Sequence, residues 1–371
     1  MENNNDNKVL NVPHLRFPEF SGEWKKCKLG DLCNVLMCKR ILVSQTNTED
    51  GVPFYKIGTI GSTPDAYISK ELFDDYKVKY NYPRKGEVMI TCAGTVGKCV
   101  VYDGEDAYFQ DSNIVWIDNP TQYISNGFLF HLLSKVDWRK LNSTTIIRIY
   151  NDDLRNLKMS YPRKEEQQKI SHLLSLLDER IATQNKIIEK LQSLIKGLAV
   201  ALTTKEKANI AISQCLECHS STLQESEVLS SGLCKVFGAN GLVGYKDVPQ
   251  MNGDAILVIK DGSGVGTVSY AQGKFSVIGT LNYLTVIGNN DLRYLYFALS
   301  VFNFQPYKTG MAIPHIYFKD YGKAKIYCPS LAEQKRVANA LDKLESKLFV
   351  EQELLASFNQ QKLYLLRKMF I

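Results

Sequence analysis

The chain contains 371 residues, 44% of them hydrophobic, and its 45 Lys and Arg against 39 Asp and Glu give a formal net charge of +6. This length exceeds what one compact domain usually holds, so two domains plus further elements are expected. The slight positive charge permits nucleic-acid binding without requiring it. No apolar run approaches ~18 residues and the N-terminus is polar, which excludes a membrane span and predicts a soluble, cytoplasmic protein.

The N-terminal part of the chain is predicted to be rich in β-structure. Residues 1–12, with many Asn and Asp, are expected to form a disordered tail. Residues 13–160 form a first domain in which basic and aromatic residues gather in loops such as 76–85; a solvated face explains this gathering as well as a binding surface does. The expected elements are strands at 52–60, 86–93, 99–102 and 113–117 and a helix at 128–141.

A long amphipathic helix is predicted at 161–204. Its core-facing residues recur alternately every four and three positions, the heptad spacing of a two-helix coiled coil. Such a narrow apolar stripe requires another long helix as its partner, and Gln184 interrupts it. The apolar seam includes Ile170, Leu174, Leu177, Ile181, Ile188 and Leu191.

A second β-rich domain is predicted at 205–327, after a polar linker. Its start at 210–232 has no clear counterpart of Trp24 or of Leu29-Gly30-Asp31, so the position of its first strand stays open. The expected elements are strands at 254–260, 265–270 and 283–287 and a helix at 292–302.

The nine cysteines are scattered through apparent core segments, which is typical of reduced thiols in a cytosolic protein. Cys215-Leu-Glu-Cys218-His219 has the spacing used for haem attachment. Haem attachment needs export, for which no signal is evident, and zinc would need further ligands, with only Cys234 nearby. Chance spacing is therefore the preferred interpretation, and neither a metal site nor a cofactor is predicted.

The second long helix, at 328–371, repeats the first. Pro162 and Pro329 precede the two helices and lie 167 residues apart, and the same offset maps the first seam onto a second one. Gln184 maps onto Glu351, and both helices open with a Glu-Gln pair, Glu166-Gln167 and Glu333-Gln334. The repeated apolar seam includes Val337, Leu341, Leu344, Leu348, Leu355 and Phe358. The return path between the helices favours an antiparallel pair, with the polar positions fixing its register.

The two β-rich domains also echo each other. A strand leads into a glycine loop at 89–97 and at 256–266, and Arg148-Ile-Tyr150 followed by Asp153 matches His315-Ile-Tyr317 followed by Asp320. The predicted fold is α+β: two β-rich domains separated by two long helices that form an antiparallel coiled coil, with an internal pseudo-twofold repeat.

No catalytic constellation is evident in the sequence. The glycine loops lack the spacing and the following helix of a dinucleotide fingerprint, and no P-loop occurs. Asp74-Asp75 and Asp152-Asp153 have no partner His or metal cluster and are interpreted as caps or solvated charge. The chain is predicted to be a non-catalytic reader and scaffold.

Several motifs in this order resemble the specificity subunit of type I restriction-modification enzymes. They are Leu15-Arg16-Phe17-Pro18 with Trp24, Leu29-Gly30-Asp31, and the duplicated proline and Glu-Gln helix starts. The resemblance implies two target-recognition domains that read an asymmetric two-part sequence in double-stranded DNA. It also implies docking of two modification subunits and, through them, of restriction subunits, with S-adenosylmethionine held by the partner methyltransferase.

Basic and polar residues of both β-rich domains are candidates for the DNA interface. Those expected to line the DNA are Lys39, Arg40, Lys56, Lys77, Lys98 and Arg148 in the first domain and Lys246, Lys260, Lys274 and His315 in the second. Those expected to read bases are Thr59, Gln110, Asn113, Asn240, Tyr245 and Asn282. A free-standing DNA-binding regulator and a coiled-coil adaptor that does not bind DNA remain as alternatives.

Overall fold

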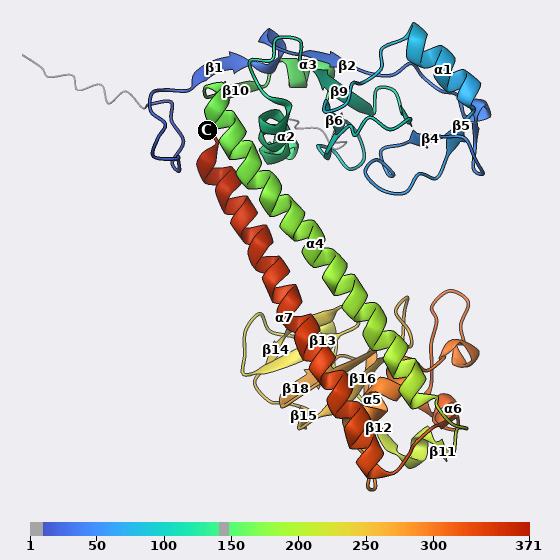
Figure 1. The fold of residues 1–371 in the computed structure, drawn as a ribbon. Helices are drawn as coiled ribbons and strands as arrows, with labels where there is room; N and C mark the ends of the chain where they lie inside the picture. The colour runs from blue at the N-terminus through green and yellow to red at the C-terminus, as the bar shows by residue number, and fades with distance from the viewer. Residues whose placement is uncertain (1–9, 141–147) are drawn as a thin grey trace, which may run out of the picture. The chain divides into compact units, whose positions relative to one another are not determined.

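The computed structural model describes residues 10–140 and 148–371, which form two compact units (Figure 1). Unit 1 contains the described residues up to Thr183 together with Leu355–Ile371, and unit 2 contains Gln184–Leu354. Each unit therefore combines one β-rich region with part of each long helix. The helices are α1 (Lys70–Lys79), α2 (Asn126–Lys135), α3 (Asn151–Arg155), α4 (Lys164–Thr203), α5 (Leu292–Ser300), α6 (Phe318–Tyr321) and α7 (Leu331–Met369).

Unit 1 contains two four-stranded sheets and a two-stranded ribbon. The first sheet has the order β2-β9-β6-β7, the second has the order β3-β5-β4-β8, and β1 pairs with β10. The strands are β1 (Lys25–Lys28), β2 (Asn34–Leu36), β3 (Thr46–Asn47), β4 (Val52–Tyr55), β5 (Tyr67–Ile68), β6 (Val88–Thr91), β7 (Cys99–Val101), β8 (Tyr108–Phe109), β9 (Ile114–Asp118) and β10 (Lys158–Tyr161). All four residues of β6 are buried, as expected for a central strand covered on both faces.

Unit 2 repeats this plan. Its first sheet has the order β12-β19-β16-β17 and its second β14-β13-β18-β15, while β11 pairs with β20. The parallel pair β13–β18 corresponds to β4–β8 of unit 1. The strands are β11 (Ile210–Ala211), β12 (Leu216–Ser220), β13 (Cys234–Gly238), β14 (Gly241–Lys246), β15 (Met251–Asn252), β16 (Ala255–Ile259), β17 (Val268–Ala271), β18 (Lys274–Val277), β19 (Leu281–Val286) and β20 (Lys325–Ile326). The α+β fold with an internal repeat is thus confirmed.

The expected strands occur, but most are shorter than expected because turns end them early. The helix expected at 128–141 is α2, which stops at Lys135 because Val136 has an extended backbone. The tail expected at 1–12 needs a correction at its end: Asn11 is buried, and its side-chain amide donates to the Trp24 carbonyl at 2.6 Å. Residues 1–9 lie outside the described part of the chain.

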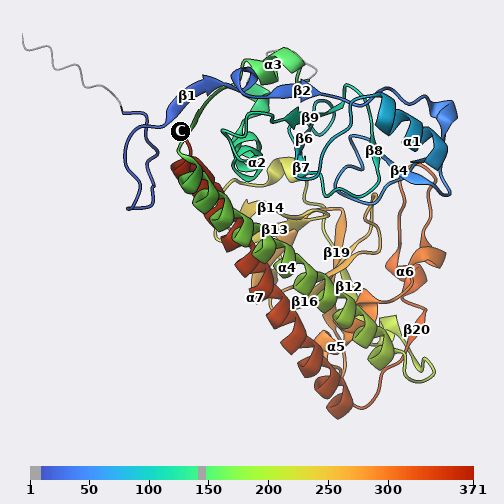
Figure 2. The same cartoon turned by 45° about the horizontal axis from the view of Figure 1, so that its top comes forward.

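The long helices α4 and α7 pack side by side (Figures 1 and 2). All twelve predicted apolar seam residues are buried or half-buried. In unit 1, Asp178 of α4 forms an ion pair with Lys362 of α7, and Arg180 lies over the ring of Phe358. From the first of these contacts to the second, the residue number increases in α4, from 178 to 180, and decreases in α7, from 362 to 358. The two helices therefore run antiparallel.

In unit 2 the same helices meet at the polar seam position. The Gln184 amide donates to the Glu351 carbonyl at 3.0 Å and to its carboxylate at 2.5 Å. A polar pair within an apolar seam fixes which residues face each other, because a shifted register would leave both groups without these partners.

The two Glu-Gln pairs at the helix starts behave differently. Gln167 and Gln334 have the same role: each side-chain oxygen accepts from the backbone of a helix N-cap residue, Ser125 and Asp291, at 2.7 and 2.8 Å. Each glutamine therefore links the start of a short helix to the start of a long one, α2 to α4 and α5 to α7.

The glutamates of the two pairs have different surroundings. The carboxylate of Glu166 is fully buried, accepts from Arg16 at 2.7 and 2.8 Å, and accepts from the Trp24 indole at 3.2 Å. Glu333 instead pairs at the surface with Arg336, three residues further along the same helix. The repeat is thus broken where the N-terminal segment covers the start of α4.

The structure supplies the counterpart of Leu29-Gly30-Asp31 that is not evident in the sequence. The Asp31 carboxylate accepts from the Lys28 backbone at 2.7 Å and closes a single helical turn. The side-chain amide oxygen of Gln214 closes an equivalent turn, Ile212–Gln214, by accepting from the Ala211 backbone N–H at 3.1 Å. Glutamine thus replaces aspartate in the same capping role, which conceals the match at sequence level.

Candidate nucleic-acid interface

Three segments meet at the end of β6 in unit 1, and we call this place site 1. The backbone N–H of Cys92 donates to the Asn113 carbonyl at 2.8 Å, and that of Ile149 donates to the Cys92 carbonyl at 2.9 Å. The N–H of Gly97 donates back to Thr91 at 2.8 Å and closes the glycine loop. These bonds hold the β6–β7 loop, the β8–β9 loop and the segment from Arg148 together.

The same bonding pattern occurs at the end of β16 in unit 2, which we call site 2. The N–H of Lys260 donates to the Thr280 carbonyl at 3.0 Å, and that of Ile316 donates to the Lys260 carbonyl at 2.9 Å. Gly266 closes its loop on Ile259 at 2.9 Å. The repeat therefore places Arg148 and His315 at equivalent positions, one in each site.

Gly266 has a left-handed backbone, with φ of +88°, and a Cβ there would lie 2.9 Å from the Cβ of the buried Phe304. Gly262, in the same loop, has φ of +96° but open space around it. Gly262→Ala is expected to lower the free energy of unfolding by about 1–2 kcal/mol through backbone strain alone. Gly266→Ala is expected to cost about 1–3 kcal/mol more because the new methyl overpacks the site. Urea denaturation of both variants measures the difference, and equal losses would contradict the role of Phe304.

The polar side chains of site 1 surround the β8–β9 loop. Arg148 donates to the carbonyl and hydroxyl of Ser112 at 3.2 and 3.3 Å, and Arg40 forms an ion pair with Asp111 at 2.6 Å. The side chain of Gln110 accepts from the Ile57 backbone at 3.3 Å, which joins the turn that carries Lys56 and Thr59 to the same loop. Most candidate residues of the first domain thus gather at this loop, with Asn113 at its end.

Site 2 has a different set of side chains on the same framework. The imidazole Nδ1 of His315 lies 2.6 Å from a carboxylate oxygen of Asp261. The His315 ring stacks on the half-exposed Tyr317, and the Lys319 ammonium lies over the Tyr317 ring, 5.2 Å from its centroid. The site is therefore a cluster of aromatic and basic groups at a loop surface, the combination that suits a nucleic-acid backbone and its bases.

The remaining candidates of the first domain lie away from the β8–β9 loop or point inward. Lys77 and Lys39 are associated with α1: Lys77 forms an ion pair with Asp106 at 2.9 Å, and Lys39 lies over the Tyr80 ring. Lys98 donates its ammonium group to the Ile60 carbonyl. The loop expected at 76–85 needs a correction, because its first part, including Lys77, belongs to α1. Lys39, Lys77 and Lys98 thus lie outside the shared framework.

The remaining candidates of the second domain lie on other elements. Asn240 is the exposed turn residue between β13 and β14, and Tyr245 and Lys246 lie at the far end of β14. Asn282 needs a correction: it is 4% exposed and accepts from the Ser220 hydroxyl at 3.0 Å, so its amide is not presented to a ligand.

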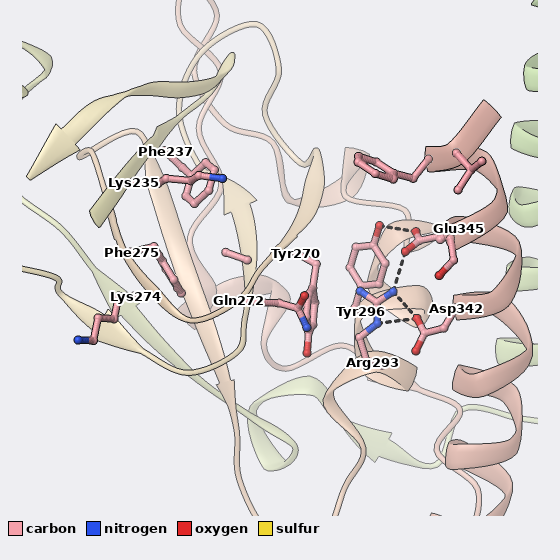
Figure 3. A pocket seen from close by; sticks show the side chains of 14 residues that line it. Lys235, Phe237, Tyr270, Gln272, Lys274, Phe275, Arg293, Tyr296, Asp342 and Glu345 are labelled. Atoms are coloured by element: carbon pink, nitrogen blue, oxygen red, sulfur yellow. Dashed lines mark hydrogen bonds and ion pairs between the residues drawn. The ribbon is translucent and has the colours of Figure 1, made fainter. Parts of the chain in front are cut away.

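Lys274 lines a groove of about 930 Å³ beside α7 (Figure 3). Across this groove, the Arg293 guanidinium lies over the rings of Tyr270 and Tyr296 at 4.3 and 4.8 Å. It also forms ion pairs with Asp342 and Glu345 of α7. Arg293 thereby connects α5 to α7. Lys274, at the start of β18, lies on the opposite side of this groove from α7 (Figure 3) and not in site 2.

Three further residues, Asp111, Ser112 and Asp261, were not predicted from the sequence, and each is a direct partner of a candidate interface side chain. The signal that could have found Asp111 and Ser112 is their position between Gln110 and Asn113. Asp261 directly follows Lys260 in the glycine loop.

The described residues contain no group of three His, Cys, Asp or Glu side chains placed to hold a metal. Cys215 is buried, while His219 lies on β12, where its ring stacks on Tyr283 and its Nε2 lies 2.8 Å from the Thr285 hydroxyl. Among the helices of residues 10–140 and 148–371, none is long and apolar enough to cross a bilayer.

Comparison with known proteins identifies the family. The model of the type I restriction modification DNA specificity domain matches residues 21–193 and again 219–360. A putative type I restriction enzyme specificity subunit, S.HindORF215P of Haemophilus influenzae, is 46% identical over 200 residues, which cover 54% of this chain and 47% of that protein. The putative MjaX specificity subunit of Methanocaldococcus jannaschii is 25% identical over 212 residues, covering 53% and 49%.

The chain thus spans about half the length of the curated relatives that it matches. The crystal structure of a type I restriction-modification S subunit from M. genitalium shares the fold, with a TM-score of 0.68 at 19% identity over 97% of this chain and 99% of that one. Since the family model covers most of the chain in two copies, the chain belongs to the DNA specificity family of type I restriction-modification systems, whose members are non-catalytic subunits.

Proposed function

We propose that this chain gives a type I restriction-modification complex its DNA sequence specificity, by reading an asymmetric two-part target with one half at each unit. The observation that carries the proposal is the repeated framework of sites 1 and 2, which presents Arg148 in one unit and His315 in the other. Equivalent backbones with different side chains suit two half-sites of different sequence, because base identity is read by side chains at base edges.

The proposal includes partners that supply the chemistry. The long helices contribute to both units and offer the shared surface on which two modification subunits dock, with restriction subunits joining through them. S-adenosylmethionine is then bound by the modification subunits, and the target adenine leaves the duplex to reach their active site. The role of the specificity chain is to hold the complex in register on the DNA.

Two lysines of unit 2, Lys260 and Lys274, are expected to differ in their effect on DNA affinity. Lys260→Ala is expected to weaken binding and to reduce the slope of log affinity against log salt by about 1, as loss of one phosphate contact does. Lys274→Ala is the matched control, since Lys274 lines the groove beside α7, and it is expected to leave the slope unchanged. Titration of a fluorescent duplex with the assembled complex at several salt concentrations measures both.

The same titration tests the proposed function against its alternatives. If only the Lys274 variant had a smaller salt slope, the DNA would bind at the groove beside α7 and not at site 2, which would contradict the proposed interface. Binding without any salt dependence would exclude a DNA role and favour an adaptor, whereas tight specific binding by the isolated chain with no effect of a methyltransferase would favour a free-standing regulator.

A further inference from the structure

A short hairpin projects from the framework of site 2. Thr309 and His315 exchange two backbone hydrogen bonds, of 2.9 and 2.7 Å, and Gly310 takes a left-handed backbone with φ of +89°. The N–H of Gly262 donates to the Pro314 carbonyl at 3.0 Å and fastens the hairpin to the glycine loop. The hairpin is therefore held by both of its ends and along one side.

The tip of this hairpin is apolar although it faces solvent. Met311 is 106% exposed, the largest value for a large apolar side chain in the part of the chain that the structure describes, and Ile313 is 58% exposed. Single exposed apolar residues need no explanation, but here two of them stand on one tightly bonded turn. A tip of this kind is suited to enter a complementary surface.

The surroundings of the tip are basic. Lys308 directly precedes the hairpin, and Lys319 lies over the Tyr317 ring. Lys260 lies beside the end of the hairpin, because its backbone carbonyl accepts from the N–H of Ile316. The carboxylate of Asp261, which would oppose a polyanion, is engaged by His315 at 2.6 Å. A positively charged collar around an apolar tip complements a nucleic acid, whose phosphates lie outside its apolar base stack.

We propose that Met311, supported by Ile313, is a wedge that enters the DNA bound at site 2 and unstacks a base-pair step there. This inference rests on the proposed function and adds to it a residue that distorts the DNA. Apolar side chains inserted between base steps kink the duplex at a cost of a few kcal/mol, which further protein contacts offset. Methionine suits the task because its unbranched, polarisable side chain adapts to the gap between bases.

A protein partner fits the tip less well. A stable protein interface buries about 800 Å² per partner, far more than one seven-residue turn presents. A base step needs only the insertion of one or two side chains. The two occupants also differ in a measurable way, since only insertion changes the stacking of individual bases.

The experiment uses the complete chain with its modification partner and a duplex carrying the methylated sequence of the native complex. The fluorescent base 2-aminopurine, which brightens when it is unstacked, replaces each adenine of the half-site assigned to unit 2 in turn. The native complex is expected to brighten the probe at one step. Met311→Ala is expected to abolish most of that increase and to weaken binding about tenfold, without changing the salt slope.

Two further variants serve as controls. Met311→Leu keeps the apolar volume and is expected to restore the signal. Val248→Ala removes apolar surface from a side chain that is 76% exposed outside the hairpin and is expected to behave like the native chain. Because Met311 makes no buried contacts, its truncation is not expected to affect folding.

The possible outcomes separate the wedge from the proposed function. Full brightening with Met311→Ala would overturn the wedge and leave the specificity role intact. Loss of assembly with the modification partner, with brightening retained in the DNA complexes that do form, would also overturn it and assign the tip to protein docking. A native complex that shows no salt-dependent DNA binding would overturn the proposed function, and the wedge with it.

Discussion

Replacement of Arg16 by methionine is expected to lower the free energy of unfolding by about 3–5 kcal/mol, because it strands a buried carboxylate. The side chain of Glu166 has no exposed surface, and among residues 10–140 and 148–371 Arg16 is its one ionic partner. After the change, the Trp24 indole still donates to this carboxylate, which no longer has a cationic partner within the described ranges of the chain. Chemical denaturation of unit 1, followed by the fluorescence of its tryptophans, measures the loss.

The internal repeat provides a matched control for this substitution. Arg336→Met removes the partner of Glu333, which occupies the equivalent position in the second helix but lies at the surface. Water solvates the remaining carboxylate, so little or no loss of stability is expected. Losses of similar size at the two positions would show that burial by the N-terminal segment does not distinguish them.

Acidification is expected to destabilise unit 1 through His131, which is 1% exposed on α2 beside the long helices. Burial lowers the pKa of its imidazole from 6.5 to about 4, although Asp178, 4.0 Å away, acts in the opposite direction. Lys362 also faces this region and adds to the lowering. The folded protein therefore keeps His131 neutral where the unfolded chain has already bound a proton.

The direction of the pH effect follows from this difference. Above pH 6.5 both states carry a neutral imidazole and the penalty is absent. As the pH falls from 6.5 towards 4, the unfolded state gains a proton that the folded state does not, and about 3 kcal/mol of stability is lost. His131→Leu is expected to remove this part of the pH dependence in urea denaturation at pH 7 and pH 4.5. An unchanged dependence in the variant would assign it to the carboxylates instead.

The long helices are the part of the fold that sequence alone predicts best. Their seam depends on local periodicity, and a 3.5-residue repeat allows few other arrangements. The Gln184 and Glu351 positions, matched only by offset, do hydrogen-bond in the structure. The strands at 86–93 and 254–260 were also predictable, since each is an apolar run that ends in a glycine loop.

Site residues were harder to predict because their roles depend on partners that are distant in the chain. Asn282 and Lys274 have the residue types of a DNA interface, yet one is buried against Ser220 and the other lines the groove beside α7. The glycine loops and the segments at Arg148 and His315 could be matched in the sequence, whereas the backbone hydrogen bonds that join them at the ends of β6 and β16 could not. The Ile212–Gln214 turn illustrates the same limit, since its geometry matches Leu29–Asp31 while its residues differ.

The most direct test is to map methylated adenines in DNA from cells that express this chain together with the modification subunit proposed as its partner. The same measurement is then repeated after residues 205–327 are exchanged for the corresponding region of a relative. The account predicts one asymmetric two-part motif for the native chain and a change in only one half of it after the exchange. No two-part motif, or a change in both halves, would contradict it.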